Sequence, residues 1–128
     1  MQTLIYHPKW EKTLSKQDRS LIEKIFRQTS SYITSLSTTM IRIAQNYKGD
    51  LLVTVLIHNP QEQPFYFKNQ CISYIEDFTC LATQAFTIDS LVIPPYTSMP
   101  WTFIFTKNSL EKEPTLHGTI NIHKNLGL

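Results

Sequence analysis

The spacing of apolar residues changes near Met40, and this change constrains the fold more than any other feature of the sequence. Before that point, apolar residues recur at helical spacing over about residues 15–28. After it, they alternate with polar residues in short runs that turn residues separate. A helix and a strand bury side chains at different spacings, so each segment fits only one of the two structures. The sequence therefore predicts one N-terminal amphipathic helix, followed by strands over about residues 40–124.

The predicted helix has both a start signal and an apolar stripe. Ser15 is suited to cap the free amides, and Asp18 follows three residues later, where a carboxylate favours the positive helix end. The apolar stripe consists of Leu21, Ile22, Ile25 and Phe26. Charged residues occupy the other face, so we expect the stripe to pack against the rest of the chain. Residues 29–39 are mostly Ser and Thr and predict a connection, with a short edge strand near residues 32–36 as one option.

The strands after residue 40 predict an antiparallel β-sandwich. The clearest pair is a hairpin of residues 40–46 and 51–58 around a turn at Lys48–Asp50. Further strands are expected at residues 65–67, 71–76, 80–88, 91–93, 101–106 and 119–123. Turn signals about every ten residues are typical of a sandwich, here with immunoglobulin-like connectivity. We therefore expect a single, mainly β domain over residues 1–128.

Composition and charge argue against several functional classes. The net charge is only +2 and the basic residues are scattered, so we expect no nucleic-acid partner. The chain has 3 glycines, too few to favour a glycine-rich phosphate loop. The first residues do not resemble a signal peptide and no apolar run is long enough to cross a membrane. These features predict a cytoplasmic protein without direct membrane insertion.

Catalytic and metal-binding patterns are absent from the sequence. It contains no G-x-S-x-G motif, and its histidines and cysteines lack zinc-ligand spacing. We expect His58 at a solvated or capped strand end, and Cys71 and Cys80 as buried or half-buried thiols whose pairing is left open. No cofactor, metal or catalytic residue is predicted. A small hydrolase is the least favoured alternative, because the sequence marks no catalytic site. It stays open because a triad can assemble from residues that are far apart in the sequence.

Aromatic residues supply the candidate binding residues. Trp101, Phe103 and Phe105 share one face of a predicted strand, which favours a place in the core over a ligand-binding surface. The loop that precedes this strand is stiffened by two prolines and carries large side chains. From this loop and from the segment before the helix, the candidate partner-binding residues are Tyr96, Met99, Trp101 and Trp10.

Four runs of the sequence resemble a known family when they are taken together in order. They are residues 7–15, 46–59, 73–76 and 91–105, of which the segment from Pro94 to Phe105 is the most specific. These runs resemble the SLAP domain of Bacillus-type Firmicutes, found in the S-layer assembly protein of the accessory Sec system. The resemblance covers about residues 7–112.

The resemblance implies a non-enzymatic accessory protein in the export of S-layer or other cell-envelope proteins. The implied partners are components of the second Sec translocase, reached from its cytoplasmic side, or the S-layer protein itself. Assembly proteins of this family tend to carry the domain in duplicate, whereas this sequence holds one copy, and a homodimer is one way to restore the pair. The alternative to this export role is a binding or regulatory protein that has an unrelated protein partner.

Overall fold

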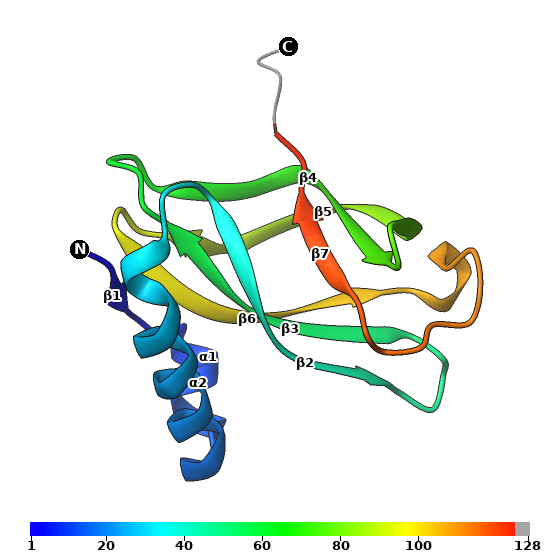
Figure 1. Ribbon diagram of the computed structural model, residues 1–128, viewed down its shortest axis with the longest axis horizontal. Coiled ribbons are helices and arrows are strands. Elements are labelled where there is room, and N and C mark those ends of the chain that lie inside the picture. Colours follow the sequence, from blue (N-terminus) through cyan, green and yellow to red (C-terminus); the bar gives the residue numbers. More distant parts are fainter. Residues whose placement is uncertain (125–128) are drawn as a thin grey trace.

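The computed structural model describes residues 1–124 of the chain, and two packed β-sheets dominate it (Figure 1). In chain order the elements are β1 (Thr3–Leu4), α1 (Pro8–Thr13), α2 (Lys16–Thr29), a 3-10 turn (Ser30–Tyr32), β2 (Ser37–Gln45), β3 (Leu51–Asn59), β4 (Phe65–Glu76), β5 (Thr79–Ile93), β6 (Thr97–Phe105), a second 3-10 turn (Lys107–Ser109) and β7 (Thr119–Ile122). Among the described residues, no helix has the length and apolar character needed to cross a membrane.

The strand order confirms the predicted sandwich. One sheet has the order β1-β6-β3-β2 and the other the order β5-β4-β7. In immunoglobulin sandwiches, strands A, B and E lie side by side in one sheet, while strand C lies between C′ and F in the other. Here β2, β3 and β6 occupy the A, B and E places, and β5, β4 and β7 occupy the C′, C and F places. The connectivity is therefore immunoglobulin-like.

Alternate residues of the strands fill the space between the sheets. Every second residue of β3 from Leu51 to Ile57 belongs to the buried core. Phe103 packs on Phe67 with ring centroids 5.5 Å apart, and Phe105 lies against Phe86 at 5.4 Å. The prediction that the aromatic row of β6 belongs to the core is thus confirmed for Phe103 and Phe105. These aromatic side chains and the aliphatic ones around them form one buried cluster, whose removal from water stabilises the sandwich.

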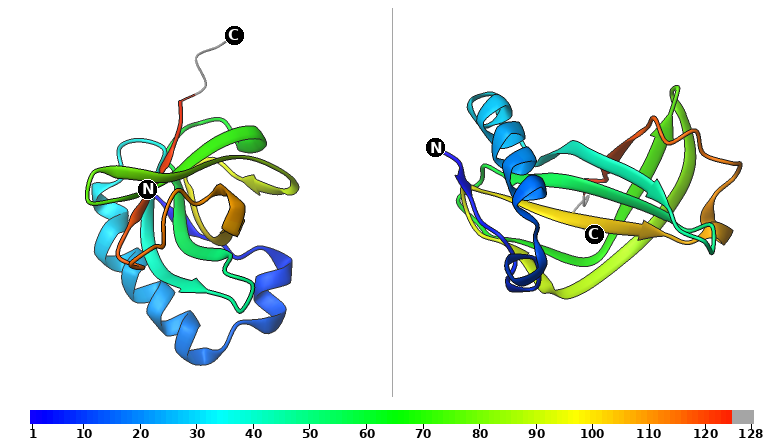
Figure 2. Two further views of the ribbon diagram at one scale, coloured as in Figure 1. Left: turned by 90° about the vertical axis from the view of Figure 1, so that its right-hand side faces the viewer. Right: turned by 90° about the horizontal axis from the view of Figure 1, so that it is seen from below.

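A second apolar layer forms where α2 lies against the outer face of the four-stranded sheet (Figure 2). Ile22 of α2 and Leu56 of β3 are buried here, outside the core between the sheets. A bulge in β2 shifts the pairing between Met40 and Arg42, so Arg42 lies opposite Thr54 on the helix side of the sheet. Because α2 covers one face and the second sheet covers the other, β3 is buried on both faces.

The predicted helix is confirmed, with Ser15 as its N-cap. Helix α1 was not predicted. Its start is marked by Pro8 in the first turn and by His7, which accepts a hydrogen bond from the Lys9 amide. The option of an edge strand at residues 32–36 was wrong. A 3-10 turn at Ser30–Tyr32 ends the helix instead, and β2 begins only at Ser37.

Two pairs of predicted short strands are continuous strands in the structure. Residues 65–76 form β4 and residues 79–93 form β5. The sequence suggested breaks because polar residues interrupt the alternation near Asn69 and Asp89. The strands continue through these positions because their pairing is irregular there. The register shifts between Phe67 and Gln70, and Asn69 adopts a φ of 49°.

Candidate functional site

The two open sides of the sandwich are built differently. On the side where β5 approaches β6, the Gln84 side chain bridges the two strands. Its Nε2 donates to the Ile104 carbonyl and its Oε1 accepts from the Thr106 amide, both at 3.3 Å. Farther along β5, the Glu111 amide donates to the Leu81 carbonyl at 2.7 Å. Side-chain and loop contacts therefore occupy this side of the sandwich.

The other side lies between β2 and β7, which approach each other without pairing. The His123 amide donates to the Cys71 carbonyl at 3.0 Å. This bond shows which residues of β7 turn their backbone groups toward β4. In an antiparallel ladder only alternate residues turn their backbone groups to the neighbouring strand. Ile120 and Ile122 consequently direct their N–H and C=O groups away from β4. This side of the sandwich presents an unpaired strand edge.

A buried carboxylate positions the segment that leads into β7. Glu76 is 3% exposed and accepts hydrogen bonds from the amides of Thr115 at 3.0 Å and Leu116 at 3.1 Å. The Tyr74 hydroxyl also donates to this carboxylate. Burial favours the neutral acid, but the hydrogen bonds outweigh it and lower the pKa of Glu76. The ionised Glu76 thus ties β4 to the start of β7.

Gly118 completes this arrangement because a larger residue does not fit there. A Cβ atom at this position would lie 2.6 Å from the Ile75 carbonyl oxygen and from the Tyr74 ring. The chain therefore needs glycine to lie this close to β4. At the other end of β7, Gln70 Nε2 donates to the His123 carbonyl at 2.6 Å. Both ends of β7 are held in place, so its free edge is presented in one fixed position.

A groove of about 770 Å³ opens beside the end of β7. It is lined by residues 34–36, 60–61 and 121–124, together with Phe65 and Gln70. Lys124 is the only lysine, arginine, aspartate or glutamate among these residues. The groove combines polar side chains with apolar ones such as Leu36, Phe65 and Ile122, and Lys124 gives it a slight positive charge. It is continuous with the unpaired edge, because Ile122 belongs to both.

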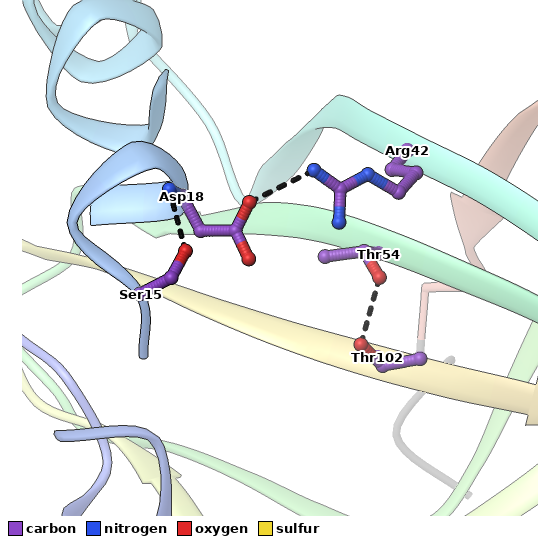
Figure 3. A network of polar contacts seen from close by, with 5 residues as sticks. All are labelled: Ser15, Asp18, Arg42, Thr54 and Thr102. Atoms are coloured by element: carbon purple, nitrogen blue, oxygen red, sulfur yellow. Dashed lines mark hydrogen bonds and ion pairs between the residues drawn. The ribbon is translucent and has the colours of Figure 1, made fainter. Parts of the chain in front are cut away.

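A smaller cavity of about 140 Å³ lies between α2 and the sheet, near the residues drawn in Figure 3. The Arg42 guanidinium donates to Asp18 Oδ1 at 2.9 Å, and this hydrogen bond lowers the pKa of Asp18. Thr54 and Thr102 bond to each other at 2.8 Å on the floor of the cavity. The two charged side chains that line the cavity, Asp18 and Arg42, pair with each other, so neither is left as an unpaired charge for a ligand.

His58 lies in a buried chain of hydrogen bonds that crosses the sheet. Its Nδ1 is 2.7 Å from Ser98 Oγ and its Nε2 is 2.8 Å from Thr39 Oγ1. Burial lowers the pKa of His58 to about 4. The prediction of a solvated or capped strand end was wrong, because α2 and the N-terminal segment cover this end of the sheet. The histidine and Ser98 are fully buried, so neither is accessible to a substrate in this structure.

The structure does not bring the four candidate partner-binding residues together. Tyr96 is 42% exposed and Trp101 is half-buried against the His7 ring, with centroids 5.2 Å apart. Met99 is 5% exposed and packs in the core, so it offers the least surface to a partner. Trp10 lines the cavity under α2, on the opposite face of the sheet from Trp101. Binding by these residues stays a prediction.

The cysteine prediction needs a correction. Cys71 and Cys80 are free and exposed rather than buried, because both strands turn these side chains to the outer face of the three-stranded sheet. Within residues 1–124, no cluster of three or more histidine, cysteine, aspartate or glutamate side chains is placed to hold a metal ion.

The residues that form the unpaired edge were not predicted as a binding site. The alternation of Ile120 and Ile122 indicated a strand but carried no sign of its place at the edge of a sheet. Glu76 ends an expected strand at residues 71–76, and no local feature of the sequence indicated that its side chain is buried.

Comparison with known proteins adds one finding. A family model described as the SLAP domain matches residues 4–123. This range includes all of the runs that carried the resemblance in the sequence and extends beyond them on both sides, so the resemblance is confirmed. Searches of curated proteins and of solved structures found no match.

Proposed function

Because the chain belongs to the SLAP domain family, we propose that it is a non-enzymatic accessory protein. In this role it assists the export or assembly of S-layer or other cell-envelope proteins through an accessory Sec pathway. The observation that carries the proposal is the family match over residues 4–123, nearly the whole of the chain. The partners are translocase components or the S-layer protein, and the place of action is the cytoplasmic side of the translocase.

The sandwich supports this role through its unpaired edge. A protein awaiting export is extended and lacks its own tertiary contacts, so its backbone groups are free to pair. An exposed strand edge binds such a segment by strand addition, in which main-chain hydrogen bonds supply affinity for many different sequences. The edge at Ile120 and Ile122 thus suits a binding module that must accept an extended client.

The buried polar groups support a binding role over a catalytic one. His58 and Ser98 are fully buried, and the hydrogen bonds of His58 run to two hydroxyl groups, with no carboxylate among its partners. A Ser–His pair that acts as a nucleophile requires access for the substrate and a third group that orients the base. This pair instead links neighbouring strands under α2.

The test is an affinity pull-down of the tagged protein from its native cells after mild cross-linking, read by mass spectrometry. Recovery of the second Sec ATPase or of an S-layer protein, above the level of a tag-only control, is the expected result. Reproducible recovery of an unrelated partner in their place would contradict the export role and favour the alternative of a binding or regulatory protein with another client.

A further inference from the structure

The sandwich has a vacant strand position beside β7. In immunoglobulin sandwiches, strand F pairs with strand C on one side and with strand G on the other. β7 occupies the F place and pairs with β4, the C strand, but within residues 1–124 no strand occupies the G place. We infer that the free edge of β7 accepts one extended segment of a partner polypeptide, which adds as the missing strand. This inference rests on the proposed function, since it names where the client binds.

The backbone chemistry of β7 fits such an addition. Ile120 and Ile122 turn their N–H and C=O groups to the open side, as the bond from the His123 amide to Cys71 requires. The anchors at Glu76 and Gln70 hold both ends of this strand in place. A rigid edge loses little conformational entropy when a segment pairs with it, which favours binding.

The side chains at the opening between β2 and β7 indicate which residue pattern the partner segment has. Four partly buried apolar residues on these two sides pack against the core: Met40 and Ile43 of β2, Ile122 of β7, and Leu116 just before β7. A strand added here would cover this apolar rim with every second side chain and expose the others to solvent. The partner segment therefore alternates apolar and polar residues.

The charge of the groove beside β7 favours some of these partner segments over others. The groove that continues from the edge contains Lys124 and no acidic residue among its lining residues. A basic segment would be repelled there, whereas a neutral or mildly acidic one is accommodated. The occupant is thus an extended, neutral to acidic segment of another protein with alternating apolar side chains.

The opposite edge serves as an internal control. The carbonyl of Leu81 in β5 faces away from β4 and accepts the Glu111 amide. Ala85, four residues along the same strand, faces outward by the same alternation. On that side, Gln84 and the Glu111 segment already occupy part of the position that an added strand would need.

The test uses a synthetic acetylated peptide of alternating Thr and Val that ends in two Glu residues. Its affinity is measured by calorimetry for the full chain and for two variants, Ile122→Pro and Ala85→Pro. Each proline removes one outward N–H and spares the ladder to β4. Circular dichroism and urea midpoints verify that both variants are folded.

We expect the peptide to bind the wild type and Ala85→Pro with affinities within about twofold, because that edge is not used. Ile122→Pro should weaken binding by about tenfold or more, since a strand partner is left unsatisfied and meets the proline ring. Amide shifts in the ¹⁵N spectrum should be largest at residues 120 and 122. Equal binding by Ile122→Pro, or a loss confined to Ala85→Pro, would overturn the assignment. So would concentration-dependent self-association that Ile122→Pro abolishes, because the occupant would then be a second copy.

The pull-down separates this inference from the proposed function. If Ile122→Pro recovers export components as well as the wild type does, the export role stands and the β7 assignment fails. If the wild type recovers only unrelated partners while the peptide still binds at β7, the binding edge stands and the export role fails.

Discussion

Acidification from pH 7 to pH 5 is expected to destabilise this protein through His58. The imidazole is fully buried and accommodated between Ser98 and Thr39. Burial disfavours its charged form and lowers the pKa from 6.5 to about 4. The unfolded chain binds a proton at this histidine as the pH falls below 6.5, whereas the folded chain does not until the pH nears 4. The free energy of unfolding is therefore highest above pH 6.5 and decreases toward pH 4.

The magnitude follows from the difference between the two pKa values. Each unit corresponds to about 1.4 kcal/mol, so the loss is about 2 kcal/mol between pH 7 and 5 and about 3 kcal/mol by pH 4. Glu76 contributes at lower pH only, because its hydrogen bonds hold its pKa below the ordinary value of 4.5. The window from pH 7 to 5 thus isolates the histidine from this carboxylate.

Urea unfolding followed by tryptophan fluorescence at half-unit pH steps measures this effect. The variant His58→Gln keeps a polar side chain of similar reach and cannot titrate, so its stability should be flat over the same window. His117→Gln, at an exposed position, is the matched control and should keep the wild-type slope. Equal slopes for the wild type and His58→Gln between pH 7 and 5 would refute the reasoning.

Three further predictions concern packing and backbone conformation, and all are measured by urea unfolding. Gly118→Ala should destabilise the fold by about 1–3 kcal/mol, because its Cβ would overlap the Tyr74 ring; an unchanged urea midpoint would contradict the close approach. Ile22→Ala should cost about 2–4 kcal/mol by leaving a cavity under α2, whereas the exposed control Lys24→Ala should change little. Phe78→Gly should stabilise the protein by about 1 kcal/mol, since Phe78 is fully exposed with a φ of 63° that glycine adopts without strain. A loss of stability in Phe78→Gly would contradict this prediction, because it would mean that the Phe78 side chain makes stabilising contacts.

The local elements were largely predictable because their signals are short-range. The helix needed only Ser15 and an apolar stripe, and the hairpin of β2 and β3 needed only alternation around Gly49, which has a φ of 88°. The aromatic row of β6 pointed to the core because an alternating strand buries one face. Predictions failed where a long-range contact sets the environment. His58 is an example, since the helix that covers it lies more than 25 residues earlier in the chain.

The sequence by itself determined the helix, most of the strands, the sandwich class and the family. Spacing, caps and turns act between neighbouring residues, and the four runs of the family are read directly from the chain. Only the tertiary structure decided that β7 is an edge strand, that Glu76 anchors it and that Gln84 bridges the opposite side. Which strand lies at an edge depends on the order in which distant segments pair. That order is set by packing between the sheets, so it cannot be predicted from the residues of the edge strand alone.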